Sequence, residues 1–263
     1  MTDSSYPPPV QIDLNCDMGE SFGRWELGAD AEIMPHVSSV NIACGAHAGD
    51  AAVMRRTLRL ASEHGVACGA HPGFADLAGF GRREIPLGPT EAADLVLCQI
   101  GALDAIARSE GIALRHVKPH GALYNMAARD RALADAIAVA VVQFDRTLVF
   151  FGLAGSVMLD AGRAAGLTVA AEGFADRAYE ADGSLTPRRI AGSVIHEVDA
   201  VVARAVRMVR ESRVTARDGA NLPLKVDTIC VHGDTPGAAS LARALRAGLD
   251  EAGVRIAPAG AIS

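Results

Sequence analysis

Four of the eight histidines in this 263-residue sequence share one setting. Each follows a short apolar run and lies close to a glycine or proline: His47, His71, His120 and His232. Histidine transfers protons near neutral pH, and its neutral ring binds transition metals. Four histidines in equivalent positions predict one shared active site. The other four are expected to pack or to cap: His36, His64, His116 and His196.

A lysine and several carboxylates extend this set. Lys118 is one of only two lysines in the chain, and it lies two residues before His120. Its compact charge could stabilise an oxyanion or bind a carboxylate, whereas a Schiff-base site would not need so many histidines. Asp13 or Asp17 could activate water while His120 or His232 protonates a leaving nitrogen. The sequence leaves both pairs of alternatives open.

The same residue types also suit a divalent metal. A carboxylate with two histidines leaves open positions for water on such an ion. Asp13 or Asp17, together with His47 and His71, would supply these ligands, and we take Asp17, His47 and His71 as the candidate set. Their separation along the chain does not fix their geometry, so catalysis with and without a metal both remain open.

Seven strand-length apolar runs place these residues. They span residues 11–16, 39–44, 66–71, 115–120, 148–153, 168–173 and 228–233. Helical patterns lie between most of them, including one over 90–111 and one that begins at Thr186-Pro187. This alternation predicts a parallel sheet, first as a seven-stranded, distorted (β/α) barrel and second as a doubly wound open sheet. Either fold gathers ligands at the carboxyl ends of its strands.

Composition limits the classes of function. The formal net charge of −6 argues against a nucleic-acid partner, which needs a basic stripe. No apolar stretch is long enough to span a membrane, and the N-terminus does not read as a signal peptide. The five cysteines contain no Cys-x-x-Cys pair, which favours reduced thiols in the cytoplasm. We expect residues 1–10 to be a disordered lead-in and residues 11–263 to form one domain.

Six motifs together resemble a known family. They are "DLNCDMGESFG", "NIACGAHAGD", "GAHPGFADLAGFGRRE", "VKPHGALYN", "EGFADRAYEADGSLTPR" and "VHGDTPGA". In this order, from about Ile12 to about Ala238, they are similar to the LamB/YcsF family, the A subunit of the prokaryotic ATP-hydrolysing 5-oxoprolinase. The resemblance covers nearly every strand end and shows no departure from the pattern.

The resemblance implies a barrel of the glycoside hydrolase/deacetylase type. It also implies opening of 5-oxo-L-proline (pyroglutamate) to L-glutamate with cleavage of ATP, shared with B and C partner subunits. No phosphate-binding loop motif is present, so we expect the partners to supply much of the ATP site. The remaining polar residues near the strand ends are candidates for substrate binding: Asn15, Glu20, Asn41, Tyr124, Glu172, Arg177 and Asp234.

Two other functions fit the residues alone. A free-standing metal-dependent deacetylase or amidohydrolase would use the same aspartates and histidines, and it would act without ATP. A non-catalytic module that binds a small metabolite is the second alternative. The number of acids and histidines counts against this module.

Overall fold

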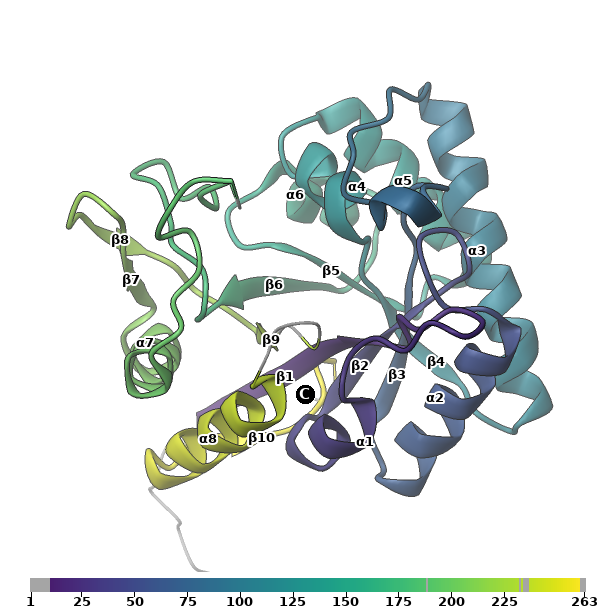
Figure 1. Ribbon diagram of the computed structural model, residues 1–263. Helices are drawn as coiled ribbons and strands as arrows, with labels where there is room; N and C mark the ends of the chain where they lie inside the picture. Colours follow the sequence, from purple (N-terminus) through teal and green to yellow (C-terminus); the bar gives the residue numbers. More distant parts are fainter. Residues whose placement is uncertain (1–9, 188, 232, 234–236, 261–263) are drawn as a thin grey trace, which may run out of the picture.

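The structure is a computed structural model that describes residues 10–187, 189–231, 233 and 237–260. Seven parallel strands close into a barrel in the order β1-β2-β3-β4-β5-β6-β9, and β9 pairs back onto β1 (Figure 1). Their bounds are Gln11–Met18, Ser39–Ala43, Ala67–His71, Leu114–Val117, Val149–Leu153, Val169–Phe174 and Thr228–Val231. A short strand β10, Arg255–Ile256, pairs with the start of β1. The barrel prediction is confirmed, and closure of the sheet excludes the open-sheet alternative.

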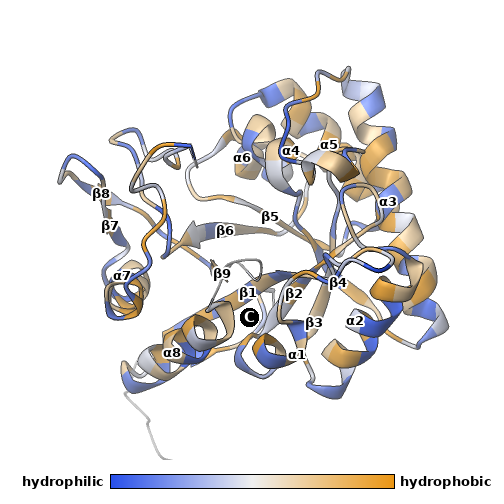
Figure 2. Ribbon diagram, in the orientation of Figure 1, coloured by the Kyte–Doolittle hydropathy of each residue, from blue (hydrophilic) through white to orange (hydrophobic). Residues whose placement is uncertain are grey.

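Helices surround the barrel (Figure 1). They are α1 Asp30–Ile33, α2 Ala51–Glu63, α3 Pro89–Ser109, α4 Gly121–Ala127, α5 Arg131–Asp145, α6 Val157–Ala164, α7 Val198–Glu211 and α8 Ala238–Glu251, with 3-10 turns at Met34–His36 and Leu77–Gly79. The α2 helix begins where the Asp50 side chain accepts hydrogen bonds from the Ala52 and Val53 amides. Figure 2 shows apolar residues concentrated along α3 and α5, which pack against each other. None of the described helices is long and apolar enough to cross a membrane.

The sequence pattern misplaced one helix and missed one hairpin. The helix predicted from Thr186-Pro187 begins only at Val198, where α7 starts. The preceding residues form turns and isolated bridges, among them Arg177 with Val194, and Gly192 has a φ of 78° that an α-helix does not allow. The segment after α7, which contains none of the seven predicted strands, forms the antiparallel hairpin β7 (Arg213–Thr215) and β8 (Asn221–Pro223).

The interior of the barrel is polar, unlike the branched aliphatic layers that commonly fill such barrels. Alternate residues of β1, Asp13, Asn15 and Asp17, carry the polar side chains that meet other strands inside, while Ile12 and Leu14 belong to the hydrophobic core. Burial without partners would be costly for these groups, so each is held by hydrogen bonds from neighbouring strands. The strands therefore position a network of charged and amide groups as well as a core.

Gly69 on β3 leaves room for the inward-pointing ring of His116. A Cβ at this position would collide with the ring of His116. We therefore expect Gly69→Ala to destabilise the fold by about 1–3 kcal/mol through overpacking. In the matched control Gly101→Ala, the new methyl on α3 meets nothing within 4 Å, and we expect a gain of about 0.5–1 kcal/mol. Denaturant unfolding of both variants checks this, and equal effects would contradict it.

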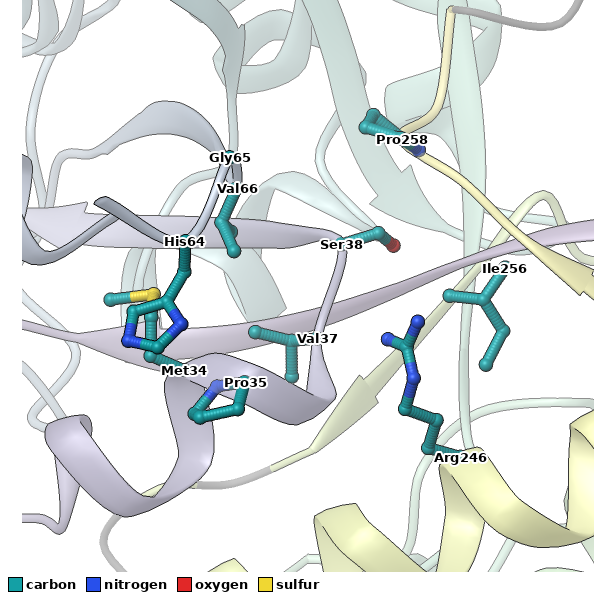
Figure 3. Close-up of a pocket in the computed structure, with 10 residues that line it drawn as sticks. All are labelled: Met34, Pro35, Val37, Ser38, His64, Gly65, Val66, Arg246, Ile256 and Pro258. Atoms are coloured by element: carbon teal, nitrogen blue, oxygen red, sulfur yellow. The ribbon is translucent and has the colours of Figure 1, made fainter. Parts of the chain in front are cut away.

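Two cavities lie at the amino-terminal end of the barrel. One, of about 270 Å³, is bounded by segments that precede β2 and β3 and by residues around β10, and Figure 3 shows His64 and Arg246 on its wall. A larger one, of about 640 Å³, borders the starts of β3, β4 and β5. Both lie at the end of the strands away from Asp17, Lys118 and His120. The candidate catalytic side chains lie instead at the carboxyl ends of the strands.

Candidate active site

Lys118 lies at the centre of the polar network, just after β4. Its Nζ is 2.9 Å from Asp17 Oδ1 and 2.9 Å from Glu172 Oε1, and it donates to Cys230 Sγ at 3.1 Å. Only 3% of the residue is exposed. Burial alone would lower the pKa of the ammonium, but the charges of Asp17 and Glu172 outweigh it and hold the pKa well above its ordinary value. Lys118 is therefore a fixed positive charge.

Glu172, on β6, is fully buried, and its Oε1 forms an ion pair with the Lys118 ammonium. Its Oε1 accepts from Asn15 Nδ2 at 3.0 Å, and its Oε2 accepts from the Tyr124 hydroxyl at 2.7 Å. Asn15 also donates to Thr228 Oγ1 and accepts from Asn41. The structure thus brings together four of the residues predicted to bind substrate, and it uses them to orient the lysine.

Asp17 ends this network on the side of the histidines. Its Oδ1 accepts from Asn41 Nδ2 at 2.8 Å and from Lys118, and its Oδ2 lies 3.4 Å from His71 Nε2. Its side chain is 14% exposed, against 4% or less for Lys118 and Glu172. Among these three charged groups, Asp17 is therefore the most open to an incoming molecule.

Asp13 occupies a different place from Asp17. It pairs with the first residue of β9, in the first half of β1, and it is fully buried. Its carboxylate accepts from the hydroxyls of Ser38, Ser39 and Thr228 at 2.6–2.7 Å. Burial raises its pKa to about 6, although these hydrogen bonds oppose the shift. The two aspartates that the sequence could not separate thus have unlike environments, and Asp13 has a structural one.

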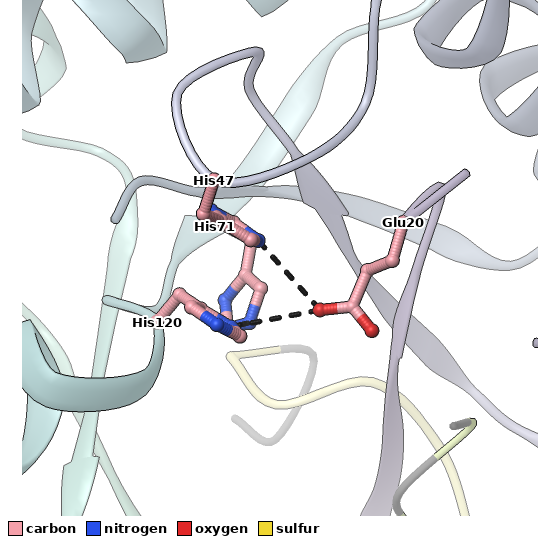
Figure 4. Close-up of side chains that lie close together, drawn as sticks. All are labelled: Glu20, His47, His71 and His120. Atoms are coloured by element: carbon pink, nitrogen blue, oxygen red, sulfur yellow. Dashed lines mark hydrogen bonds and ion pairs between the residues drawn. The ribbon is translucent and has the colours of Figure 1, made fainter. Parts of the chain in front are cut away.

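Three histidines and Glu20 form a second cluster beside Asp17 (Figure 4). His71 ends β3, whereas His47 and His120 follow β2 and β4. Glu20 Oε1 is 3.6 Å from His47 Nε2 and 3.5 Å from His120 Nδ1, and one donor atom from each of the four residues lies within 4.8 Å of the others. Burial lowers the pKa of His120 to about 3 and that of His47 well below its ordinary value. Both rings are therefore neutral near pH 7.

This cluster differs from the metal set expected from the sequence. That set was Asp17, His47 and His71, whereas the structure directs Asp17 Oδ1 to Lys118 and Asn41 and places Glu20 and His120 with the two histidines. Glu20 was expected to bind substrate. A local reason for the change is Gly19, whose φ of 68° turns the chain after β1.

Comparison with known proteins identifies the family. The LamB/YcsF family model matches residues 12–263. The chain belongs to the LamB/YcsF family. The A subunit of 5-oxoprolinase from Chloroflexus aggregans is 58% identical over 247 residues, 94% of this chain and 98% of that protein. A protein of the same name from Bacillus subtilis is 52% identical, covering 94% and 96%. The crystal structure of a lactam utilization protein from Thermus thermophilus matches with a TM-score of 0.90 and 50% identity, covering 94% of this chain and 99% of that one.

Of the remaining predicted residues of this LamB/YcsF chain, Arg177 has a structural contact set apart from the lysine and histidine clusters. Arg177 donates to the carbonyls of Ser193 and Thr186, and these contacts tie down the loop after β6. His232 and Asp234 lie outside the described residues. The catalytic roles assigned to His120 and His232 stay predictions.

Cys230 was missed because a buried cysteine usually reads as core. Burial raises the pKa of its thiol well above the ordinary value, despite the nearby Lys118 charge. The group is therefore a protonated thiol rather than a thiolate nucleophile. Cys230 lies two residues after Thr228 in β9, so the two side chains point to the same, inward face of the strand. This spacing was the sequence signal that could have identified Cys230.

Proposed function

We propose that this chain is the A subunit of a 5-oxoprolinase, which opens 5-oxo-L-proline to L-glutamate while its complex hydrolyses ATP to ADP and phosphate. The support is twofold. Relatives named as the A subunit of 5-oxoprolinase are 52–58% identical across nearly their whole length. The buried Asp17–Lys118–Glu172 arrangement, which carries the proposal, pairs a carboxylate with a fixed cation at the carboxyl ends of the strands.

The chemistry explains why ATP is needed. A five-membered lactam is a stable amide, and transfer of a phosphoryl group to its oxygen turns the ring carbon into a good electrophile. Water then adds to that carbon and the ring C–N bond breaks, so that the nitrogen leaves as an amine and the carbon becomes an acyl phosphate. A second water releases phosphate and leaves the new carboxylate of glutamate.

We assign Asp17 as the general base that activates the attacking water. Hydrogen bonds from Lys118 and Asn41 to Oδ1 fix the orientation of its carboxylate, and a general base must be held within hydrogen-bond reach of the proton it takes. Lys118 supplies positive charge for the phosphoryl oxygens or the substrate carboxylate. Glu172 and Tyr124 act as positioning residues, because they hold the lysine from the interior.

The division of labour follows from the absence of a phosphate-loop motif in the sequence. We propose that B and C partner subunits provide much of the ATP site and activate the lactam, and that this subunit opens the activated ring. We further propose that the complex works in the cytoplasm, where its thiols stay reduced. The five cysteines carry free thiols, four of them buried.

The test is glutamate release from 5-oxoproline with ATP and Mg²⁺. The chain alone and the mixture with B and C subunits are compared, and a mixture without ATP is the control. We expect turnover only in the complete mixture with ATP. Full activity of the isolated chain would refute the division of labour. No turnover in any mixture would refute the lactam assignment and return attention to a metal-dependent deacetylase acting without ATP.

A further inference from the structure

The contacts that His71 and His120 make with backbone carbonyls determine which nitrogen of each ring carries a hydrogen. His71 Nδ1 lies 2.7 Å from the Lys118 carbonyl oxygen, and His120 Nε2 lies 2.9 Å from the Phe80 carbonyl oxygen. A carbonyl oxygen only accepts hydrogen bonds, so each of these nitrogens must carry a hydrogen. With one hydrogen on each ring, the other nitrogen of each bears a lone pair.

Those two lone-pair nitrogens face each other. His71 Nε2 and His120 Nδ1 are 3.0 Å apart, and the rings meet edge to face at 85°. The carboxylate oxygens of Asp17 and Glu20 lie 3.4 and 3.5 Å from them. Electron-rich atoms at such distances repel unless a positive species lies between them. The arrangement therefore calls for a cation.

We propose that Glu20, His71 and His120 bind one divalent ion of the zinc class. Two nitrogens 3.0 Å apart can both reach one ion at about 2.0–2.1 Å, and Glu20 adds an oxygen from a third element. Imidazole with a single carboxylate suits zinc, cobalt, nickel or iron, whereas magnesium and calcium take mainly oxygen ligands. Three protein ligands leave a position open, as in catalytic rather than structural sites.

His47 completes the site in a different way. Its ring stacks on His120 with centroids 3.7 Å apart and planes only 2° from parallel. A ring nitrogen binds a metal in its own plane, so an ion in the plane of His120 lies outside that of His47. Neither nitrogen of His47 has a hydrogen-bond partner among the described residues, and Nε2 is 3.6 Å from Glu20 Oε1. We therefore assign His47 as a positioning residue for Glu20 and His120.

The experiment measures metal binding by the full chain. Protein stripped with a chelator is equilibrated with Zn²⁺, and bound metal is counted by elemental analysis. Co²⁺ serves as a second probe, because its visible spectrum reports the ligands. We expect about one equivalent bound. Affinity should fall by more than about 100-fold in His71→Ala and in Glu20→Gln, and by about 10–100-fold in His47→Phe, since lost outer partners cost that much.

The matched control is His196→Ala, which removes an exposed histidine and should leave binding unchanged. Circular dichroism shows whether each variant folds, and the isosteric Glu20→Gln keeps the test valid if His71→Ala does not. A folded wild-type chain that binds neither metal would overturn the proposal and leave a shared proton between the two rings. Undiminished binding in Glu20→Gln and His71→Ala would overturn it as well. The readout is metal binding, so it stands apart from the lactam proposal.

Discussion

Replacing Asp17 by asparagine is expected to lower glutamate formation by the assembled complex about 10²- to 10⁴-fold, the range for loss of a general base. The amide keeps the size of the side chain but cannot take a proton from water. It would also turn a neutral group toward Lys118, which lies 2.9 Å from the present carboxylate. The measurement is the rate of glutamate release at saturating 5-oxoproline and ATP, with enough B and C subunits to saturate the chain.

Two comparison variants make this prediction specific. Asp94→Asn changes an exposed aspartate on α3 and should leave the rate unchanged. Asp13→Asn alters a buried carboxylate that three hydroxyls surround, so its effect should fall on stability. A rate that survives in Asp17→Asn and collapses in a folded Asp13→Asn would reverse our assignment of the base.

The sequence indicated the barrel because its strands carry a strong local signal. Each of the seven apolar runs overlaps a barrel strand, because strands buried in a parallel sheet are rich in apolar residues. The helix expected from Thr186 does not form because contacts with residues outside the helical pattern override it. A proline and an apolar stripe satisfied the pattern, but backbone hydrogen bonds from Ala178 to Ser193 and from Thr186 to Ala178 hold that segment in turns.

The sequence predicted which residues form the site, but not which of them contact each other. The position of Asp17, Lys118 and the histidines at strand ends predicted that they belong to the site, because the carboxyl ends of parallel strands meet at one face of the barrel. Which carboxylate meets which cation depends on register across the barrel. Asn15 on β1 lies opposite Cys230 on β9, and this pairing brings Lys118 to Cys230 as well as to Asp17. Such contacts join residues over one hundred positions apart, beyond the reach of local pattern.

The Lys118→Met variant should lose both activity and stability. Methionine fills similar space but leaves Asp17 and the fully buried Glu172 without their shared ammonium. Removing one partner of a buried ion pair costs about 3–5 kcal/mol. We expect denaturant unfolding to show a loss of this size, and the complex to lose about 10²- to 10³-fold in rate, as when a group that stabilises transition-state charge is removed.

The only other lysine in the chain provides the control. Lys225 is exposed, so Lys225→Met should change stability by no more than about 0.5 kcal/mol and leave the rate intact.

The double variant Lys118→Met/Glu172→Gln separates the two roles of Lys118. Neutralising Glu172 should restore part of the lost stability, since the buried charge no longer lacks a partner. The rate should stay low, because no cation then faces the substrate. Recovery of both would mean that Lys118 acts only as a structural counter-ion, whereas a stable and active Lys118→Met would remove the lysine from the mechanism.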